Sequence, residues 1–287
     1  MKYIFILCII IYLVCTSIES FKVLDNKNNC NIKLFNEHED VICLIGIWGR
    51  LDLVQINIDL LKQQTKKCKI LLIVSCDKDK KFAIDNNVDW VYTDNQPLGR
   101  KWQVGLDACK KYNPNAILIN GSDDLLSLNW VEKCYHYIVK QTYDIVGKSN
   151  WFVLDLIEKK PFRFKYRNNR VLLGAGRMIS RSILDELNWS LFPLHKSKGL
   201  DSHCNMILNQ HNATRLVLNT NDIFVISLKG QYDTLNSLSK LLLVNTKLQS
   251  IVIQHKHIQI LKKIIYFINT NQSKRVIQYF QLFEKLF

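Results

Sequence analysis

Two adjacent carboxylates, Asp123 and Asp124, combine residue type and position in a way that could support chemistry. They closely follow the apolar run 116–119, which is typical of a buried strand in a parallel sheet. The carboxyl end of such a strand faces the crevice where α/β folds bind ligands. Carboxylates beside an apolar sheet need a cation, and a divalent ion that also binds substrate phosphates would supply it. The pattern therefore predicts a site for Mg²⁺ or Mn²⁺.

The same pair also has a plainer interpretation. Two aspartates in front of an apolar segment are a common N-cap, and the segment 125–140 has the composition of a helix. In that case both carboxylates would lie in solvent and stabilise the helix dipole. From these two residues alone, the metal site and the cap are about equally supported.

The rest of the chain predicts how such a site is positioned. Between residues 40 and 150, short apolar runs alternate with amphipathic segments, which is typical of a parallel sheet flanked by helices. Beyond residue 150 we expect a hairpin, a glycine-rich turn at 174–177, helices at 182–187 and from 199, and late strands at 215–218 and 223–228. The predicted strands of the first part are 41–47, 69–75, 88–92, 116–119 and 143–147, with helices between them.

Composition restricts the partners. The chain has 287 residues and 48% apolar content, which is enough for a sizeable core. Its 39 basic and 25 acidic residues give a net charge of +14, which attracts phosphates or anionic membranes. No zinc-finger spacing, RNA-binding aromatic signature or dense Arg/Lys block is present, so we expect no nucleic-acid partner. The nine cysteines are scattered singly, which favours neither a disulfide scaffold nor a cysteine metal site.

The two ends of the chain differ from its middle. Residues 1–20 have the apolar length of a signal peptide or short signal-anchor, and residues 21–38 are a polar linker. Residues 39–230 form the predicted catalytic domain. Residues 231–287 form a basic, amphipathic helical tail that either packs on the body or lies on an anionic membrane.

The apolar N-terminus predicts entry into the secretory pathway or association with a membrane, with a cytoplasmic location as the alternative. Lys22, Lys27 and Lys33 after the apolar run favour a retained anchor with the catalytic domain in the cytoplasm. Asn120 begins a glycosylation sequon next to the carboxylate pair, which also argues against a lumenal domain. The topology stays open at this stage.

Several segments together carry a family resemblance. In order, they are Gly46-Ile47-Trp48-Gly49-Arg50, Asn95 to Gly105, Gly121-Ser122-Asp123-Asp124, Gly174-Ala175-Gly176-Arg177 and Gly199-Leu200-Asp201. With this arrangement, residues 40–230 resemble the GT-A nucleotide-sugar glycosyltransferases of the family 2 type. The resemblance implies an α/β fold of the GT-A class: a Rossmann-like nucleotide-binding sheet flanked by helices, with an acceptor-side region of strands and loops and a helical C-terminal tail.

The resemblance also implies roles for individual residues. Asp123 and Asp124 would hold Mn²⁺ or Mg²⁺, and Asp201 would be the catalytic base. The acceptor-binding residues would be Gly174, Ala175, Gly176 and Arg177. The donor-binding residues would be Gly46, Ile47, Trp48, Arg50, Ser75, Gly99, Lys101 and Ser122.

This sequence departs from the family pattern at three places. Gly121 replaces the first Asp of the Asp-x-Asp motif, and Leu200 replaces the Glu that precedes the catalytic Asp. At the end of the second strand, Ser75 and Cys76 stand where the family has an acidic residue that reads the base or ribose. The donor nucleotide therefore stays open between uridine and guanosine.

The implied function is transfer of a sugar from a UDP- or GDP-sugar to a hydroxyl of a glycan, lipid or protein. If Asp201 is the base, the product has inverted anomeric configuration; as a residue alone, Asp201 could equally be a helix N-cap. Two other functions share part of the pattern: a sugar nucleotidyltransferase, and a non-catalytic, membrane-associated carbohydrate-binding relative.

Overall fold

The computed structural model describes residues 38–166, 168, 171–230, 248–250, 255–270 and 272–285. These residues belong to one compact unit. The predicted signal segment, nearly all of the linker and residues 231–247 of the tail lie outside the described residues. The predictions on membrane entry and on the domain limits therefore stay predictions.

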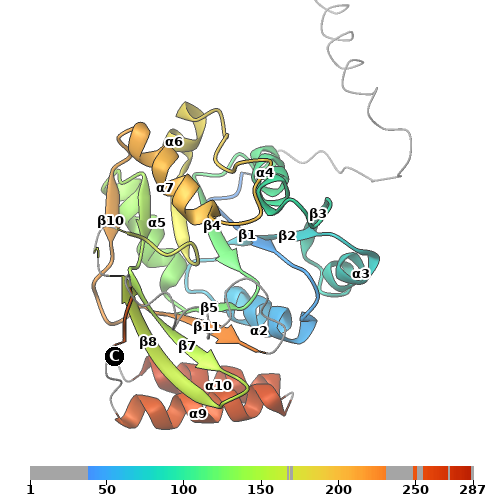
Figure 1. Ribbon diagram of the computed structural model, residues 1–287, viewed down its shortest axis with the longest axis vertical. Coiled ribbons are helices and arrows are strands. Elements are labelled where there is room, and N and C mark those ends of the chain that lie inside the picture. Colours follow the sequence, from blue (N-terminus) through green and yellow to red (C-terminus); the bar gives the residue numbers. More distant parts are fainter. Residues whose placement is uncertain are drawn as a thin grey trace, which may run out of the picture. The chain divides into compact units, whose positions relative to one another are not determined.

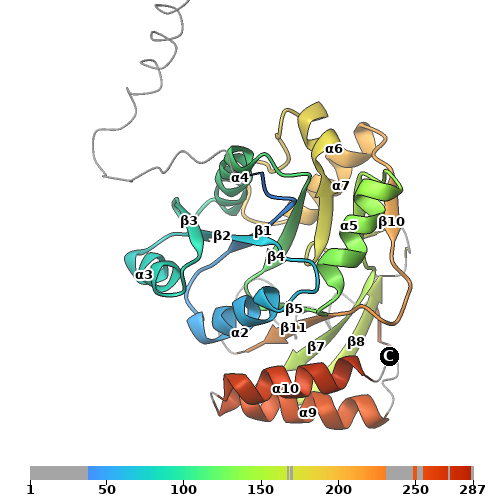
Figure 2. The ribbon, with the colours of Figure 1, turned by 180° about the vertical axis from the view of Figure 1, so that it is seen from behind.

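A seven-stranded sheet forms the centre of the unit (Figures 1 and 2). Its parallel strands β3, β2, β1 and β4 lie side by side, which confirms the predicted α/β sheet. One strand was not predicted: β9 runs antiparallel between β4 and β6, where we expected only a glycine turn leading into a helix. In spatial order the strands are β10 (Arg215–Val217), β6 (Ile145–Gly147), β9 (Arg177–Ser180), β4 (Ala116–Gly121), β1 (Val41–Gly46), β2 (Lys69–Val74) and β3 (Asp89–Tyr92).

Helices cover both faces of this sheet because successive side chains of each buried strand point to opposite sides. On β1, Cys43 and Ile45 belong to one apolar core, while Ile42 and Leu44 belong to another. The first core includes α2 (Leu51–Lys62), α3 (Asp77–Asp85) and α5 (Trp130–Lys140), and the second includes α4 (Leu98–Cys109), α6 (Arg181–Glu186) and α7 (Leu200–Gln210).

The first strand of a second, five-stranded sheet begins within the carboxylate pair. Asp124 is the first residue of β5, and it pairs with Ser227 of β11 in an antiparallel register. The predicted helix at 125–140 therefore starts later, at Trp130, and the N-cap interpretation of the two aspartates is wrong. The strand order is β12 (Leu248–Ser250), β8 (Lys160–Tyr166), β7 (Asn150–Asp155), β11 (Val225–Lys229) and β5 (Asp124–Leu126).

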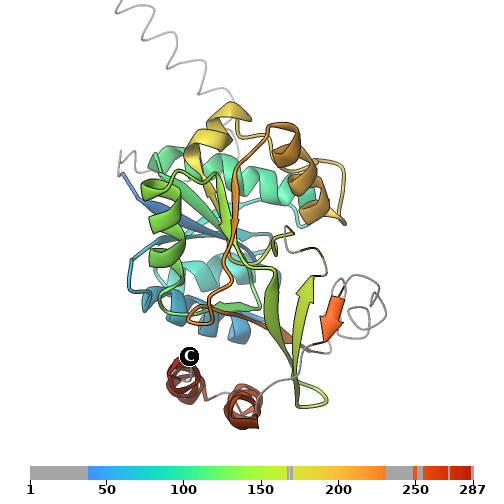
Figure 3. The same ribbon diagram turned by 90° about the vertical axis from the view of Figure 1, so that its left-hand side faces the viewer.

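Two C-terminal helices, α9 (His255–Asn269) and α10 (Ser273–Glu284), pack against this second sheet. Figure 3 shows them next to each other and nearly end on. Their apolar sides share a core with Phe152 and Phe224 of the sheet region, which confirms that this part of the tail is helical and packs on the body. None of the described helices combines the length and the apolar character that crossing a bilayer requires.

Candidate active site

The turn between β4 and β5 holds both carboxylates in a buried, charge-paired position. One oxygen of Asp123, Oδ2, lies 2.7 Å from Lys229 Nζ and 3.5 Å from Arg50 Nη1. Arg50 also donates to the hydroxyl of Ser122 at 3.0 Å. Burial raises the pKa of Asp123, but Lys229 and Arg50 outweigh it and leave the pKa below its usual value. Asp123 is therefore held as an anion between two cations.

Asp124 has a different environment. The hydroxyl of Ser227 donates to Asp124 Oδ1 from the neighbouring strand. Burial and the nearby charge of Asp123 raise the pKa of Asp124 to about 6. The turn itself is fixed by two amides, since Asn57 Nδ2 donates to the carbonyl of Gly121 and Asn120 Nδ2 to the carbonyl of Asp124, both at 2.8 Å.

Gly121 explains the missing first Asp of the family motif. A Cβ at this position would lie 2.1 Å from Asp124 Oδ2 and 3.4 Å from Asp123 Oδ1. A side chain here would displace the Asp124 carboxylate, which glycine avoids. The same geometry brings together two carboxylate oxygens that neither Lys229 nor Ser227 uses.

This donor set fits a divalent ion. Mg²⁺ is commonly held by one or two carboxylates together with substrate phosphates, and Mn²⁺ accepts the same ligands. Among the described residues no cluster of three or more His, Cys, Asp or Glu side chains could hold a metal, so the protein would contribute two carboxylates at most. The metal site stays a prediction.

The raised pKa of Asp124 predicts a specific pH dependence. A carboxyl group with a raised pKa in the folded state favours folding when protonated, and this contribution is lost as the pH rises through about 6. Asp124→Asn removes it, so between about pH 4.5 and about pH 7.5 the variant should gain stability relative to wild type by on the order of 2 kcal/mol. Urea unfolding at the two pH values measures this, with the exposed Asp85→Asn as control. Parallel stability curves for wild type and Asp124→Asn would contradict the assignment.

The loop after β1 is held by a buried lysine. Lys101, from α4, donates to the carbonyl of Ile47 at 2.5 Å and to Asn95 Oδ1 at 2.9 Å. Its side chain is almost fully buried, and burial lowers its pKa to about 8. We predicted Lys101 as a cation for the donor; the structure shows it engaged with the loop that carries Trp48 and Arg50. Its contacts position that loop.

Two buried oxygens lie beside this loop without a hydrogen-bond partner among the described residues. They are Ser75 Oγ, at the end of β2, and Asp79 Oδ2, in α3. The other oxygen of Asp79 accepts the N–H of Gly49 at 3.2 Å. An unpartnered buried carboxylate oxygen is costly, which indicates that a ligand or water completes it. Sequence reasoning missed Asp79 because it sits in a highly charged helix.

Gly99 packs against a distant segment of the chain. Its N–H donates to the carbonyl of Lys196 at 2.8 Å, and a Cβ there would lie 1.8 Å from the carbonyl oxygen of Pro193. Close backbone contact with this segment is therefore what the glycine permits. Gly46 has a comparable role on β1, since a Cβ would meet the ring of Trp102 at 3.2 Å.

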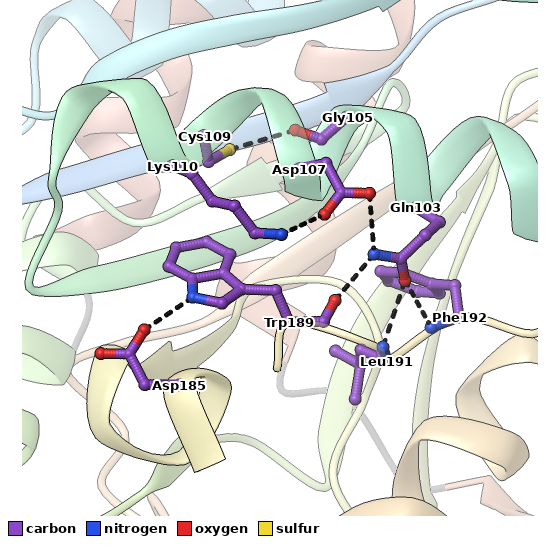
Figure 4. A network of polar contacts seen from close by, with 9 residues as sticks. All are labelled: Gln103, Gly105, Asp107, Cys109, Lys110, Asp185, Trp189, Leu191 and Phe192. Carbon is purple, nitrogen blue, oxygen red and sulfur yellow. Dashed lines mark hydrogen bonds and ion pairs between the residues drawn. The ribbon is translucent and has the colours of Figure 1, made fainter. Parts of the chain in front are cut away.

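Gln103 ties α4 to the same segment, as Figure 4 shows. Its Nε2 donates to the carbonyl of Trp189 at 2.7 Å, and its Oε1 accepts the N–H groups of Leu191 and Phe192, both at 3.1 Å. One buried side chain thus satisfies three backbone groups that regular secondary structure leaves unpaired. Residues 189–192 are followed along the chain by Pro193 and Lys196, which contact Gly99, and then by α7.

Replacing Gln103 by leucine should destabilise the protein by about 3 kcal/mol, since three buried backbone groups lose their partner at once. The measurement is the urea unfolding midpoint of Gln103→Leu against wild type. Lys81→Gln is the control, because Lys81 is exposed and its ion pair with Asp85 lies on another helix, α3. Equal midpoints for Gln103→Leu and wild type would show that the network contributes nothing.

The predicted acceptor turn and Asp201 come together. A Cβ on Gly174 would lie 2.3 Å from Asp201 Oδ1, so the carboxylate rests directly on this glycine. The Asp201 side chain is 64% exposed and lies 3.9 Å from Arg177 Nη2. Arg177 itself is buried and donates to the carbonyls of Leu172 and Leu173. These two hydrogen bonds hold the chain that leads into the turn.

The acceptor turn lies at the same sheet edge as the carboxylate pair. The N–H of Gly176 donates to the carbonyl of Ile119 at 2.9 Å, and Arg177 pairs with Ile119 across β4 and β9. Gly176 has a φ of +73° and accepts the indole N–H of Trp130, while Ala175 packs on the first apolar core. Asp201, Asp123 and Asp124 therefore all lie around the carboxyl end of β4.

Four polar residues of the site were not predicted: Lys229, Ser227, Asn57 and Asn120. Lys229 and Ser227 lie more than 100 residues after the carboxylates. Their strand was expected, but its pairing with β5 has no signal in the sequence. From the sequence alone, Asn57 is indistinguishable from any other polar residue of an amphipathic helix.

No protein-family model matches this sequence, and no curated protein matches it. Solved structures do match. S. aureus TarS 1–349 aligns with a TM-score of 0.50 and 10% identity, over 86% of this chain and 91% of that chain, and its complex with UDP gives the same values. A further S. aureus TarS structure aligns with a TM-score of 0.50 and 9% identity, over 84% of this chain and 55% of that chain.

At this level of identity the comparison concerns the fold. TarS is a GT-A glycosyltransferase. The alignment with TarS 1–349 spans 86% of this chain. This chain therefore has a GT-A-like fold.

Proposed function

We propose that this protein is a metal-dependent glycosyltransferase that moves a sugar from a UDP- or GDP-sugar to an acceptor hydroxyl with inversion. The observation that carries the proposal is the carboxylate turn of Asp123 and Asp124, buried beside Arg50 and Lys229 in a GT-A-like fold. The comparison supports it, because one of the matching TarS structures is a complex with UDP.

The donor nucleotide would bind along the loop after β1. Ser75 Oγ and Asp79 Oδ2 are buried acceptors without a partner among the described residues, and they suit the N–H groups of a nucleobase. Trp48 is 57% exposed on the same loop and offers a face for stacking. In this arrangement Asp79 would supply the carboxylate that the second strand lacks.

The diphosphate would bind at the carboxylate turn. Arg50 and Lys229 balance the charges of Asp123 and Asp124, so the site has little excess charge for a lone metal ion or a lone diphosphate. Asp123 and Asp124 would hold a metal ion, and that ion would supply charge stabilisation for the leaving diphosphate. Because metal and nucleotide neutralise each other, each should strengthen the binding of the other.

The acceptor would approach from the side of Asp201. Its carboxylate is exposed and rests on Gly174, which leaves space for a sugar hydroxyl. Asp201 would take the hydroxyl proton while the oxygen forms a bond to the anomeric carbon of the donor. The bond from that carbon to the diphosphate breaks on the opposite face, and the electron pair leaves with the diphosphate. Attack from the opposite face gives the inverted product.

Calorimetric titration of the full-length protein tests the donor half of this proposal. We expect UDP or GDP to bind in the presence of Mn²⁺, and the affinity to fall when the ion is removed with EDTA. We also expect Mn²⁺ alone to bind much more weakly than Mn²⁺ with the nucleotide. If neither nucleotide binds under either condition, the proposed donor site is wrong.

A further inference from the structure

The helical hairpin of α9 and α10 has an outer surface that the proposed reaction does not use. Its inner side packs against the second sheet, since Leu261, Ile264 and Phe280 are fully buried in the core that they share with it. The hairpin is thus fixed in orientation. Its opposite side, facing away from that core, is a stable surface of the folded unit.

The charges on this outer surface all have the same sign. Between residues 255 and 285 the chain has six Lys or Arg residues, and all six are exposed. The single acid of this segment, Glu284, turns inward and accepts the backbone N–H of Leu128. The cationic residues are Lys256, Lys262, Lys263, Lys274, Arg275 and Lys285.

Apolar and aromatic side chains lie among these cations. Tyr266 is 57% exposed and Leu282 is 38% exposed. Phe267 of α9 stacks on Tyr279 of α10 with ring centroids 5.2 Å apart, and Lys263 Nζ lies 5.0 Å from the Tyr279 ring. Tyrosine and lysine side chains each have an apolar body and a polar end. Such side chains favour the boundary between lipid and water.

We propose that the outer surface of the α9–α10 hairpin docks on an anionic lipid bilayer, with both helices lying in the plane of the membrane. A helix pair with a cationic surface and a few apolar side chains is suited to this peripheral mode of binding. The small exposed apolar area makes attraction to lipid headgroups the main contribution, so binding weakens as salt screens the charges. The proposal is independent of the proposed enzymatic activity.

Nucleic acid is the other polyanion that such a surface could attract, and the details disfavour it. The two aromatic rings between the helices stack on each other. The hairpin has a single arginine, and its guanidinium donates to Gln278 of its own helix. Recognition of nucleic acid would need aromatic platforms for bases or several arginine forks for phosphates.

The test is vesicle co-sedimentation of the full-length protein, with vesicles of phosphatidylcholine alone and of phosphatidylcholine with phosphatidylserine. Wild type should bind the anionic vesicles more tightly. The triple variant Lys263→Gln, Lys274→Gln, Arg275→Gln should lose on the order of a hundredfold in this affinity. The matched control replaces Lys78, Lys81 and Lys140 by Gln, since these residues are equally exposed but lie on other helices.

Every outcome of this experiment decides the proposal. An N-terminal membrane segment would bind both kinds of vesicle. The difference in affinity between anionic and neutral vesicles therefore reports on the hairpin. Equal loss in the triple variant and in the control would show a general charge effect and overturn the docking surface, as would absence of anionic selectivity in wild type. Displacement by RNA at concentrations that leave the control unaffected would assign the surface to nucleic acid. Unchanged melting temperatures verify that each variant is folded.

Discussion

Asp201→Asn should lower the turnover of sugar transfer by about 10²- to 10⁴-fold and leave the affinity for the nucleotide nearly unchanged. An amide keeps the size of the carboxylate but cannot take the proton of the attacking hydroxyl. Proton removal belongs to the transition state, so its loss appears in turnover and not in donor binding. Asp201 is exposed, and its ion pair with Arg177, at 3.9 Å, is the contact that the amide weakens.

The measurement is steady-state sugar transfer, with nucleotide affinity determined separately by calorimetry. Asp85→Asn makes the same chemical change on an exposed helix far from the acceptor turn and should retain full turnover. Unchanged turnover in Asp201→Asn would remove Asp201 from the role of base. A product with retained anomeric configuration would remove the inverting mechanism as well.

Asp123→Asn should abolish the dependence of nucleotide binding on metal. The substitution removes a metal ligand and one negative charge, while Arg50 and Lys229 stay in place. The affinity for UDP or GDP with Mn²⁺ should therefore fall by at least about a hundredfold. The affinity without metal should rise, because the two cations no longer have Asp123 as a partner. The ratio of the two affinities should approach one.

Loss of a charge partner also lowers stability, by on the order of 3 kcal/mol for a buried pair. The binding measurement is therefore made well below the melting temperature of the variant. Asp222→Asn is the control, because it breaks the more exposed ion pair with Lys133 and should leave the metal dependence intact. If Asp123→Asn kept the wild-type ratio of affinities, the metal would bind elsewhere.

The sequence was sufficient to predict most of the central sheet. Short apolar runs such as 41–45 and 70–74 alternate with amphipathic helices, which is typical of an α/β fold. The short strands were harder. β5 has three residues and follows two aspartates, so its composition resembles a helix start, and its pairing with β11 is made across about 100 residues. The antiparallel β9 was missed for the same reason.

The position of a candidate residue could be predicted where it follows from a single segment. Asp123 and Asp124 were located by the strand before them, and the turn at 174–177 by its glycines. Residues whose role depends on a partner far away in the sequence could not be predicted. Lys101 has the same sequence features as a surface lysine, and only the fold shows that it binds the carbonyl of Ile47. Lys229 likewise became part of the site only through strand pairing.

Hydrolysis of a panel of nucleotide-sugars by the full-length protein with Mn²⁺ tests the central claim most directly. In the absence of acceptor, a glycosyltransferase slowly passes the donor sugar to water, which releases a free sugar and a nucleoside diphosphate. We predict this pair of products from a UDP- or GDP-sugar, and we predict that Asp123→Asn suppresses it. No hydrolysis of any donor would contradict the assignment as a glycosyltransferase. Release of pyrophosphate in a parallel assay, supplied with a nucleoside triphosphate and a sugar or sugar phosphate, would contradict it as well.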